Sequence, residues 1–170
     1  MKIVNTKVAQ IQDNQKCGEF LWCIKDWKNI KERARLEIQT SIYSDPFYSH
    51  KNGYKMCLRL DFYGIFTGKT THFFLSVCIM KGEFDDTLQW PFGYDVRLDL
   101  LNQETGLPHI SRMVNSVNDS NNPSWNEPPT SNKNIEHGIS WFVKLSELYS
   151  NVLLCKDNQI CIMVTPQIKP

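Results

Sequence analysis

The segment 54–62 alternates between large apolar side chains and smaller or charged ones. Because successive side chains of a β-strand point to opposite faces, this period of two predicts a strand with one buried and one solvent-facing side. A helix would scatter the same apolar side chains around its circumference. The set expected to be buried is Tyr54, Met56, Leu58, Leu60 and Phe62, and the opposite set is Lys55, Cys57, Arg59 and Asp61.

Further short stretches of β-type residues lie on both sides of this segment, at 18–27, 38–43, 71–80, 94–101, 139–145 and 160–164. Trp90-Pro91-Phe92 interrupts the series, since proline cannot donate to a strand ladder. Helical residues are confined to 27–34, with Asp26 as the expected N-cap, and to a turn at 146–148. Helices this short cannot cross over between parallel strands. The pattern therefore predicts an all-β fold, an antiparallel β-sandwich of seven to eight strands with short helical turns.

The chain divides into a leader, 1–17, and one domain, 18–170, whose length suits a single core. In the leader, Val4, Val8 and Ile11 recur at spacings of four and three, which are the spacings of a coiled-coil seam. A frayed or disordered tail has such spacings too, so both interpretations stay open. Residues 115–136 are rich in Asn, Ser and Pro, and we expect a long surface loop there.

The charge balance, 19 basic against 18 acidic residues, argues against a nucleic-acid partner. No apolar run approaches the roughly 20 residues that a membrane span needs, and the N-terminus lacks the apolar core of a signal peptide. We therefore expect a cytoplasmic protein without membrane insertion.

The six cysteines are Cys17, Cys23, Cys57, Cys78, Cys155 and Cys161. No pair has the two-residue spacing of a zinc knuckle or a redox dithiol. Most lie in apolar strand patterns, where a free cysteine packs as a small hydrophobic residue. The even number leaves disulfides open, but the pattern favours reduced cysteines.

No group of catalytic residues is evident in the sequence. There is no nucleophile elbow and no phosphate-binding glycine loop. The four histidines are widely separated, and the one candidate calcium turn, Glu83 with Asp85 and Asp86, lacks the pattern of a calcium loop. We expect no metal, no cofactor and no enzyme activity, although an enzyme stays open as a third hypothesis.

Several motifs follow one another along the domain. They are 18–24 (GEFLWCI), 45–48 (DPFY), 53–60 (GYKMCLRL), Gly68, Thr71-His72, 80–82 (MKG), 90–92 (WPF), 100–103 (LLNQ) and 156–158 (KDN). From Gly18 to about Gln167 this pattern resembles the C-terminal TRAF domain of the tumour-necrosis-factor-receptor-associated factors (TRAFs), a branch of the MATH family. The WPF and GYKMCL segments together are specific to the TRAF branch.

The resemblance implies an eight-stranded sandwich that forms a homotrimer through a preceding coiled coil, of which the leader would be the end. Such domains bind short extended peptides from receptor cytoplasmic tails or adaptor proteins, beside an edge strand. The RING that carries catalysis in family members has no counterpart here, so we expect the adaptor end alone.

The resemblance also implies a peptide site. Arg59 falls where the family has a basic residue near the peptide. Asp61 stands where Tyr is common, Ile65 where Asp is common, and Ser76 where an aromatic residue is common. The serine cluster that binds a peptide Gln is reduced to Ser124, which Trp125 follows. Ile139, after Gly138, stands where another branch has an aromatic cage.

These departures argue against the acidic, Gln-containing receptor motifs that the family usually binds. Arg59 and Asp61 share a strand face, so the carboxylate partly neutralises the guanidinium and repels an acidic peptide. One exposed pair is worth only ~0.2–1 kcal/mol, but several such contacts shift a preference. We hypothesise a less acidic ligand. Considered without the resemblance, Arg59 is better explained by an ordinary surface ion pair with Asp61 or a neighbouring strand.

Besides the enzyme hypothesis left open above, two functions agree with the resemblance. The first is a signalling adaptor that links receptor tails or other adaptors to ubiquitin ligases. The alternative is a substrate-recognition domain, as MATH domains are in ubiquitin-ligase adaptors and some deubiquitinases. The WPF and GYKMCL segments favour the first.

Overall fold

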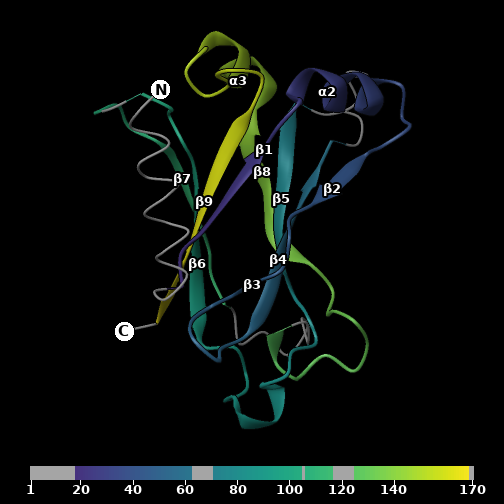
Figure 1. The fold of residues 1–170 in the computed structure, drawn as a ribbon, viewed down its shortest axis with the longest axis vertical. Coiled ribbons are helices and arrows are strands. Elements are labelled where there is room, and N and C mark those ends of the chain that lie inside the picture. The colour runs from purple at the N-terminus through teal and green to yellow at the C-terminus, as the bar shows by residue number, and fades with distance from the viewer. Residues whose placement is uncertain (1–17, 63–70, 105, 117–124, 169–170) are drawn as a thin grey trace.

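The computed structural model describes residues 18–62, 71–104, 106–116 and 125–168, which form two antiparallel sheets (Figure 1). The first sheet has the order β1 (Phe20–Ile24), β9 (Ile160–Ile168), β6 (Tyr94–Leu100) and β7 (Ile110–Val114). The second has the order β2 (Ser41–Tyr43), β4 (Lys55–Asp61), β5 (His72–Ile79) and β8 (His137–Lys144), and β3 (Phe47–Tyr48) also pairs with β4. The predicted antiparallel sandwich is confirmed.

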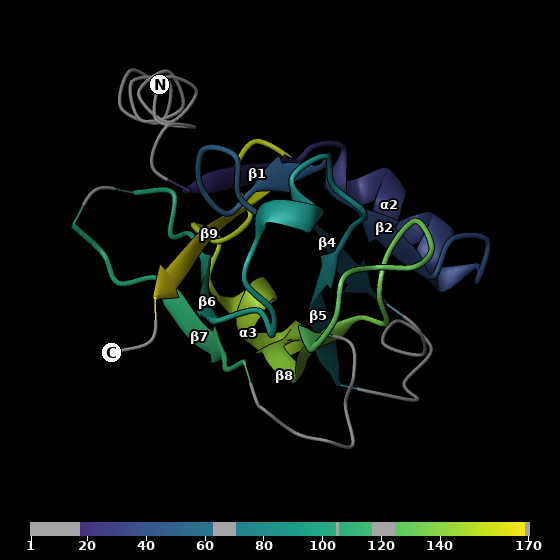
Figure 2. The same cartoon turned by 90° about the horizontal axis from the view of Figure 1, so that it is seen from below.

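The two sheets enclose one core. Seen from below, β6, β7 and β9 lie on one side of the molecule and β4 and β5 on the other (Figure 2). All five apolar side chains that the alternation assigned to the inner face of 54–62 are buried. From the first sheet, the inward side chains of β6 are buried in the same cluster, namely Val96, Leu98 and Leu100. The period-two pattern therefore identified the inner face of β4 correctly.

The helices lie at the ends of the sandwich. Figure 1 shows α2 (Trp27–Arg35) and α3 (Leu145–Ser150) together at one end. The 3-10 turn η2 (Asp85–Thr87) follows β5. Among the described residues, no helix has both the length and the apolar content needed to cross a membrane.

The helix predicted at 27–34 is present, but its expected cap is not. Asp26 has a left-handed backbone conformation and its side chain makes no capping hydrogen bond. Instead, Asn158 receives the first donors of the helix: its backbone oxygen accepts from the Trp27 N–H at 2.9 Å, and its side-chain oxygen accepts from the Lys28 N–H at 2.8 Å. The turn before β9 therefore fixes the start of α2. Because the capping residue comes from this distant turn, the residues next to the helix wrongly predicted Asp26 as the cap.

Two strands were not predicted. β7 carries the exposed Arg112 opposite the buried Leu98, so its apolar alternation is interrupted. β3 has only two residues, directly after Pro46. Both strands form because β6 and β4 offer them partners, which local sequence patterns do not reveal.

The preference for reduced cysteines is wrong for one pair. Cys23 of β1 and Cys161 of β9 are opposite each other, with Cα atoms 4.2 Å apart, and form a disulfide. Cys57, Cys78 and Cys155 are free. Cys57 and Cys78 are direct partners across β4 and β5 and are buried, so Cys57 is not exposed although it lies on the outer side of β4.

Candidate functional site

One row of residues crosses the face of the second sheet that points away from the core, which we call the outer face. Strand pairing places Tyr43 of β2 opposite Arg59 of β4, Arg59 opposite Ser76 of β5, and Ser76 opposite Gly138 of β8. Side chains that are paired in this way lie on the same side of a sheet. The register therefore brings together Arg59, Ser76 and Gly138, three of the residues that the resemblance to TRAFs selected.

Arg59 makes two ion pairs on this face. Its Nη2 lies 2.8 Å from Oδ1 of Asp61, two residues along the same strand, and its Nη1 lies 3.4 Å from Oε1 of Glu136. Its guanidinium also lies over the Tyr43 ring, 5.8 Å from the centroid. The expected pairing of Arg59 with Asp61 is present, and a second carboxylate joins it.

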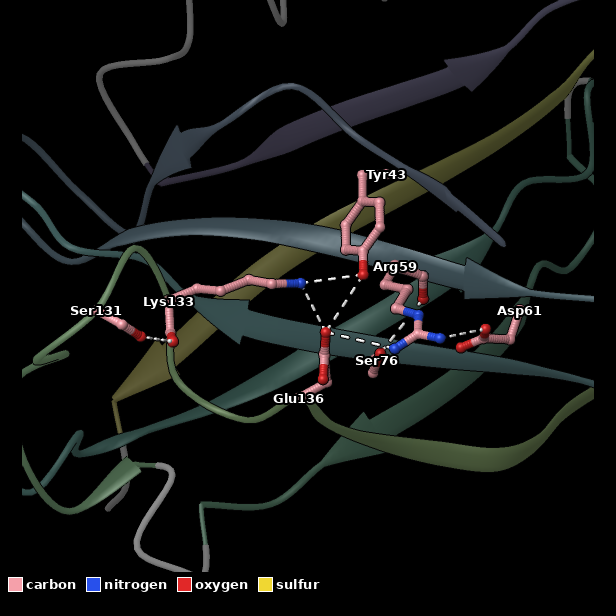
Figure 3. Close-up of polar contacts among 7 residues, drawn as sticks. All are labelled: Tyr43, Arg59, Asp61, Ser76, Ser131, Lys133 and Glu136. Carbon is pink, nitrogen blue, oxygen red and sulfur yellow. Dashed lines mark hydrogen bonds and ion pairs between the residues drawn. The ribbon is translucent and has the colours of Figure 1, made fainter. Parts of the chain in front are cut away.

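Glu136 is bound from three sides through one oxygen (Figure 3). Besides Arg59, its Oε1 accepts from Lys133 Nζ at 2.7 Å and from the Tyr43 hydroxyl at 3.4 Å. Lys133 Nζ also donates to the Tyr43 hydroxyl at 3.0 Å and lies 4.2 Å from the centre of that ring. We call Tyr43, Arg59, Asp61, Lys133 and Glu136 the charged cluster.

Backbone pairing next to β5 positions Lys133 and Glu136. The Asn134 N–H donates to the carbonyl of Ile79 at 2.8 Å, and the Lys81 N–H donates to the carbonyl of Asn132 at 2.9 Å. The Ser131 hydroxyl donates to the Lys133 carbonyl at 3.0 Å. Segment 132–134 is thereby attached to the end of β5, ahead of β8, and Glu136 reaches the outer face from there.

The two carboxylates have opposite pKa shifts. For Glu136, burial alone would raise the pKa, but the hydrogen bond from Lys133 and the charges of Lys133 and Arg59 outweigh it, so the pKa is lowered. For Asp61, burial is the largest effect and the nearby Arg59 opposes it only in part, so the pKa is raised. The ionised form of Glu136 is therefore the better stabilised of the two.

The same contacts affect Lys133. Burial alone would lower its pKa, but the hydrogen bonds to Glu136 and Tyr43 raise it above the ordinary value. Counted by formal charge, the cluster holds two cations, Arg59 and Lys133, and two anions, Asp61 and Glu136. Its formal charge sums to zero, so it gives little net attraction to an acidic ligand.

The other predicted residues lie in different places. Ser76 is fully buried and its hydroxyl donates to the Arg59 carbonyl at 3.4 Å. Ile139 is opposite the buried Leu75, so it packs on the core side of the sheet. Trp125 is 3% exposed, with its ring 5.0 Å from that of Phe92. Ile65 and Ser124 lie outside the described residues.

Gly138 allows β8 to lie close to β5. A Cβ built on this residue would be under 3.0 Å from the Leu75 carbonyl oxygen and from two atoms of Ser76. Only glycine permits that separation without a shift of the backbone. Gly138 therefore has a packing role in this structure, and it lies two residues after Glu136 of the charged cluster.

An aromatic pair lies further along the same face. The Trp141 ring is 4.7 Å from that of His72, and Trp141 is 69% exposed. The register also sets Phe74 opposite Asp61. An apolar surface therefore adjoins the charged cluster on the side of Asp61.

Three members of the charged cluster had no signal in the sequence. Tyr43 ends a short strand, and Lys133 and Glu136 lie in the stretch that the sequence identified only as a long loop. A Lys and a Glu three residues apart meet on a helix, but this segment is not helical. Only the pairing of 132–134 with β5 brings them to Arg59.

The described part of the chain contains no group of three or more His, Cys, Asp or Glu residues that could hold a metal ion. At the turn considered for calcium, Asp85 accepts a hydrogen bond from the Gly82 N–H at 2.9 Å. That carboxylate therefore serves the turn itself.

Comparison with known proteins identifies the family of this chain. The family model described as TRAF/meprin, MATH domain matches residues 39–163, which contain the whole charged cluster. The chain belongs to this family. The MATH domain is 35% identical to mouse TNF receptor-associated factor 5, with 95% of this chain aligned, and 30% identical to human TNF receptor-associated factor 2, again over 95%.

A solved structure of TRAF5 from Notothenia coriiceps superposes on the MATH domain with a TM-score of 0.79 at 26% identity, covering 98% of this chain and 83% of that one. The resemblance to TRAFs is thereby confirmed in both sequence and fold. This chain spans 30% of the length of mouse TRAF5 and 32% of human TRAF2.

Proposed function

We propose that this MATH domain is a non-enzymatic adaptor module of TNF receptor signalling in the cytoplasm. Its ligand is an extended peptide from a receptor tail or an adaptor protein, bound beside β8 and across the outer face of the second sheet. The observation that carries the proposal is the row Tyr43, Arg59, Ser76 and Gly138, which leads from the charged cluster to β8.

The position of β8 suits this mode of binding. In the part of the chain that the structure describes, β8 is the last strand of its sheet, after β5. A terminal strand offers backbone groups to an added strand, and side-chain pockets beside it then select the sequence. The charged cluster and the exposed Trp141 supply a polar and an apolar contact on the adjoining face.

We further propose that the complete protein is a homotrimer, joined by a coiled coil that ends in the leader 1–17, outside the described residues. The relatives compared above are TRAFs, which favours the receptor-signalling role over substrate recognition in a ubiquitin-ligase adaptor or deubiquitinase. The neutral charge of the cluster favours a ligand that is less acidic than the family norm.

Fluorescence polarisation with labelled receptor-tail peptides, acidic and non-acidic, tests the proposal. We expect dissociation constants of about 10–1,000 μM for the isolated domain, and loss of binding in Arg59→Ala. Arg97→Ala is a matched control, because Arg97 pairs with Asp99 two residues along β6, at 3.0 Å, on the first sheet. Equal loss in both variants, or no binding of any peptide to the wild type, would contradict the proposal.

A further inference from the structure

The Oε1 atom of Glu136 occupies an anion position that the protein builds from three donors. They are Lys133 Nζ at 2.7 Å, the Tyr43 hydroxyl at 3.4 Å and Arg59 Nη1 at 3.4 Å. The donors come from β2, from β4 and from the segment before β8. Three donors around one oxygen are what a peptide carboxylate would need at this place.

We propose that Glu136 determines the specificity of the peptide site by acting as an intramolecular substitute for a ligand carboxylate. This inference rests on the proposed peptide-binding function. With Glu136 in place, the site takes a peptide that presents an uncharged amide or hydroxyl side chain to the cluster. An acidic side chain is selected against, because the position that it needs is already filled.

The energetic reason lies in the burial of the cluster. The side chain of Glu136 is 21% exposed and that of Arg59 is 32% exposed. A ligand carboxylate that displaced Glu136 would leave this partly buried anion without its partners, and leaving a charged group unpaired costs more than the new contacts return. An uncharged side chain can bind beside Tyr43, which is 47% exposed, without breaking the ion pairs.

Asp61 has a lesser part in this selection. Its one ion pair is with Arg59, at 2.8 Å, and it contacts neither Lys133 nor Tyr43 among the hydrogen bonds and ion pairs of the described cluster. Removing its charge leaves Glu136 in the three-donor position. The two carboxylates, which a charge count treats alike, are therefore expected to differ in their effect on binding.

The test uses pairs of labelled receptor-tail peptides that are identical except for Glu or Gln at one position. Fluorescence polarisation compares the wild type with Glu136→Gln, which keeps the size of the side chain and removes its charge. We expect Glu136→Gln to raise the affinity for the Glu-containing peptides about tenfold and to change that for the Gln-containing peptides little. Asp61→Asn should raise it less.

Glu147→Gln is the control, because Glu147 is an exposed residue of α3, on a different element from every member of the cluster. Thermal unfolding verifies that each variant is folded. If peptides bind in an Arg59-dependent way but Glu136→Gln leaves the Glu-to-Gln affinity ratio unchanged, the role of Glu136 is refuted and the peptide site stands. If no peptide binds the wild type or any variant, both are refuted. Acidic peptides that bind only Glu136→Gln, while the non-acidic peptides bind the wild type, support both.

Discussion

Replacement of Gly138 by alanine tests whether the close approach of β8 to β5 is required. The added Cβ would lie 2.6 Å from Ser76 Cβ, and under 3.0 Å from Ser76 Cα and the Leu75 carbonyl oxygen. Ordinary Cβ contacts lie at 3.4–4 Å, so the two strands must separate by about 1 Å. Two of the three atoms belong to the backbone of a central strand, and a change of side-chain rotamer cannot relieve the overlap.

Overpacking of this kind destabilises a folded domain by about 1–3 kcal/mol. In a domain of this size each kcal/mol lowers the melting temperature by about 2–4 °C, so we expect Gly138→Ala to lower it by about 2–12 °C. Differential scanning calorimetry measures the shift. Gly93→Ala is the matched control, because a Cβ at Gly93 meets nothing within 4 Å, and its melting temperature should be unchanged or slightly raised. Equal melting temperatures for the two variants would refute the packing argument.

Two further predictions concern the charge of Glu136 and the cysteines. The folded state lowers the pKa of Glu136 below its ordinary 4.5, so the ionised form of Glu136 stabilises the fold above that pH. The wild type should therefore melt at a higher temperature than Glu136→Gln, and this difference should shrink as the pH falls below about 4.5. A difference in melting temperature that does not change with pH would contradict the prediction. Iodoacetamide should label the half-buried Cys155 slowly, since burial raises its pKa. It should leave the buried Cys57 and Cys78 unlabelled until the protein is denatured. Mass spectrometry that found either of these two labelled in the native protein would contradict the prediction.

The core of the sandwich was largely predictable from local sequence. The alternation at 54–62 identified the inner face of β4, and the apolar stretch at 71–80 identified β5 as a central strand. Such patterns work because successive side chains of a strand alternate between the two faces of the sheet, whichever strands it pairs with. The failures, β3 and β7, are strands whose own residues carry too weak a pattern.

The proposed peptide site was predictable only in part. The resemblance selected Arg59, Ser76 and Gly138, which the register joins in one row. It also selected Trp125 and Ile139, whose side chains pack into the core. Residues that are neighbours in sequence, such as Gly138 and Ile139, face opposite sides of β8, and this assignment depends on the pairing with β5.

By itself, the sequence determined the strands with strong alternation, the all-β class and the composition of the core, because these depend on periodicities within a few residues. The tertiary structure alone decided which distant groups meet. Asn158 caps α2, Cys161 bonds to Cys23, and Glu136 enters the three-donor position beside Arg59. Each of these contacts joins residues far apart in the chain. Strand order and register bring them together, and no local pattern encodes these two properties.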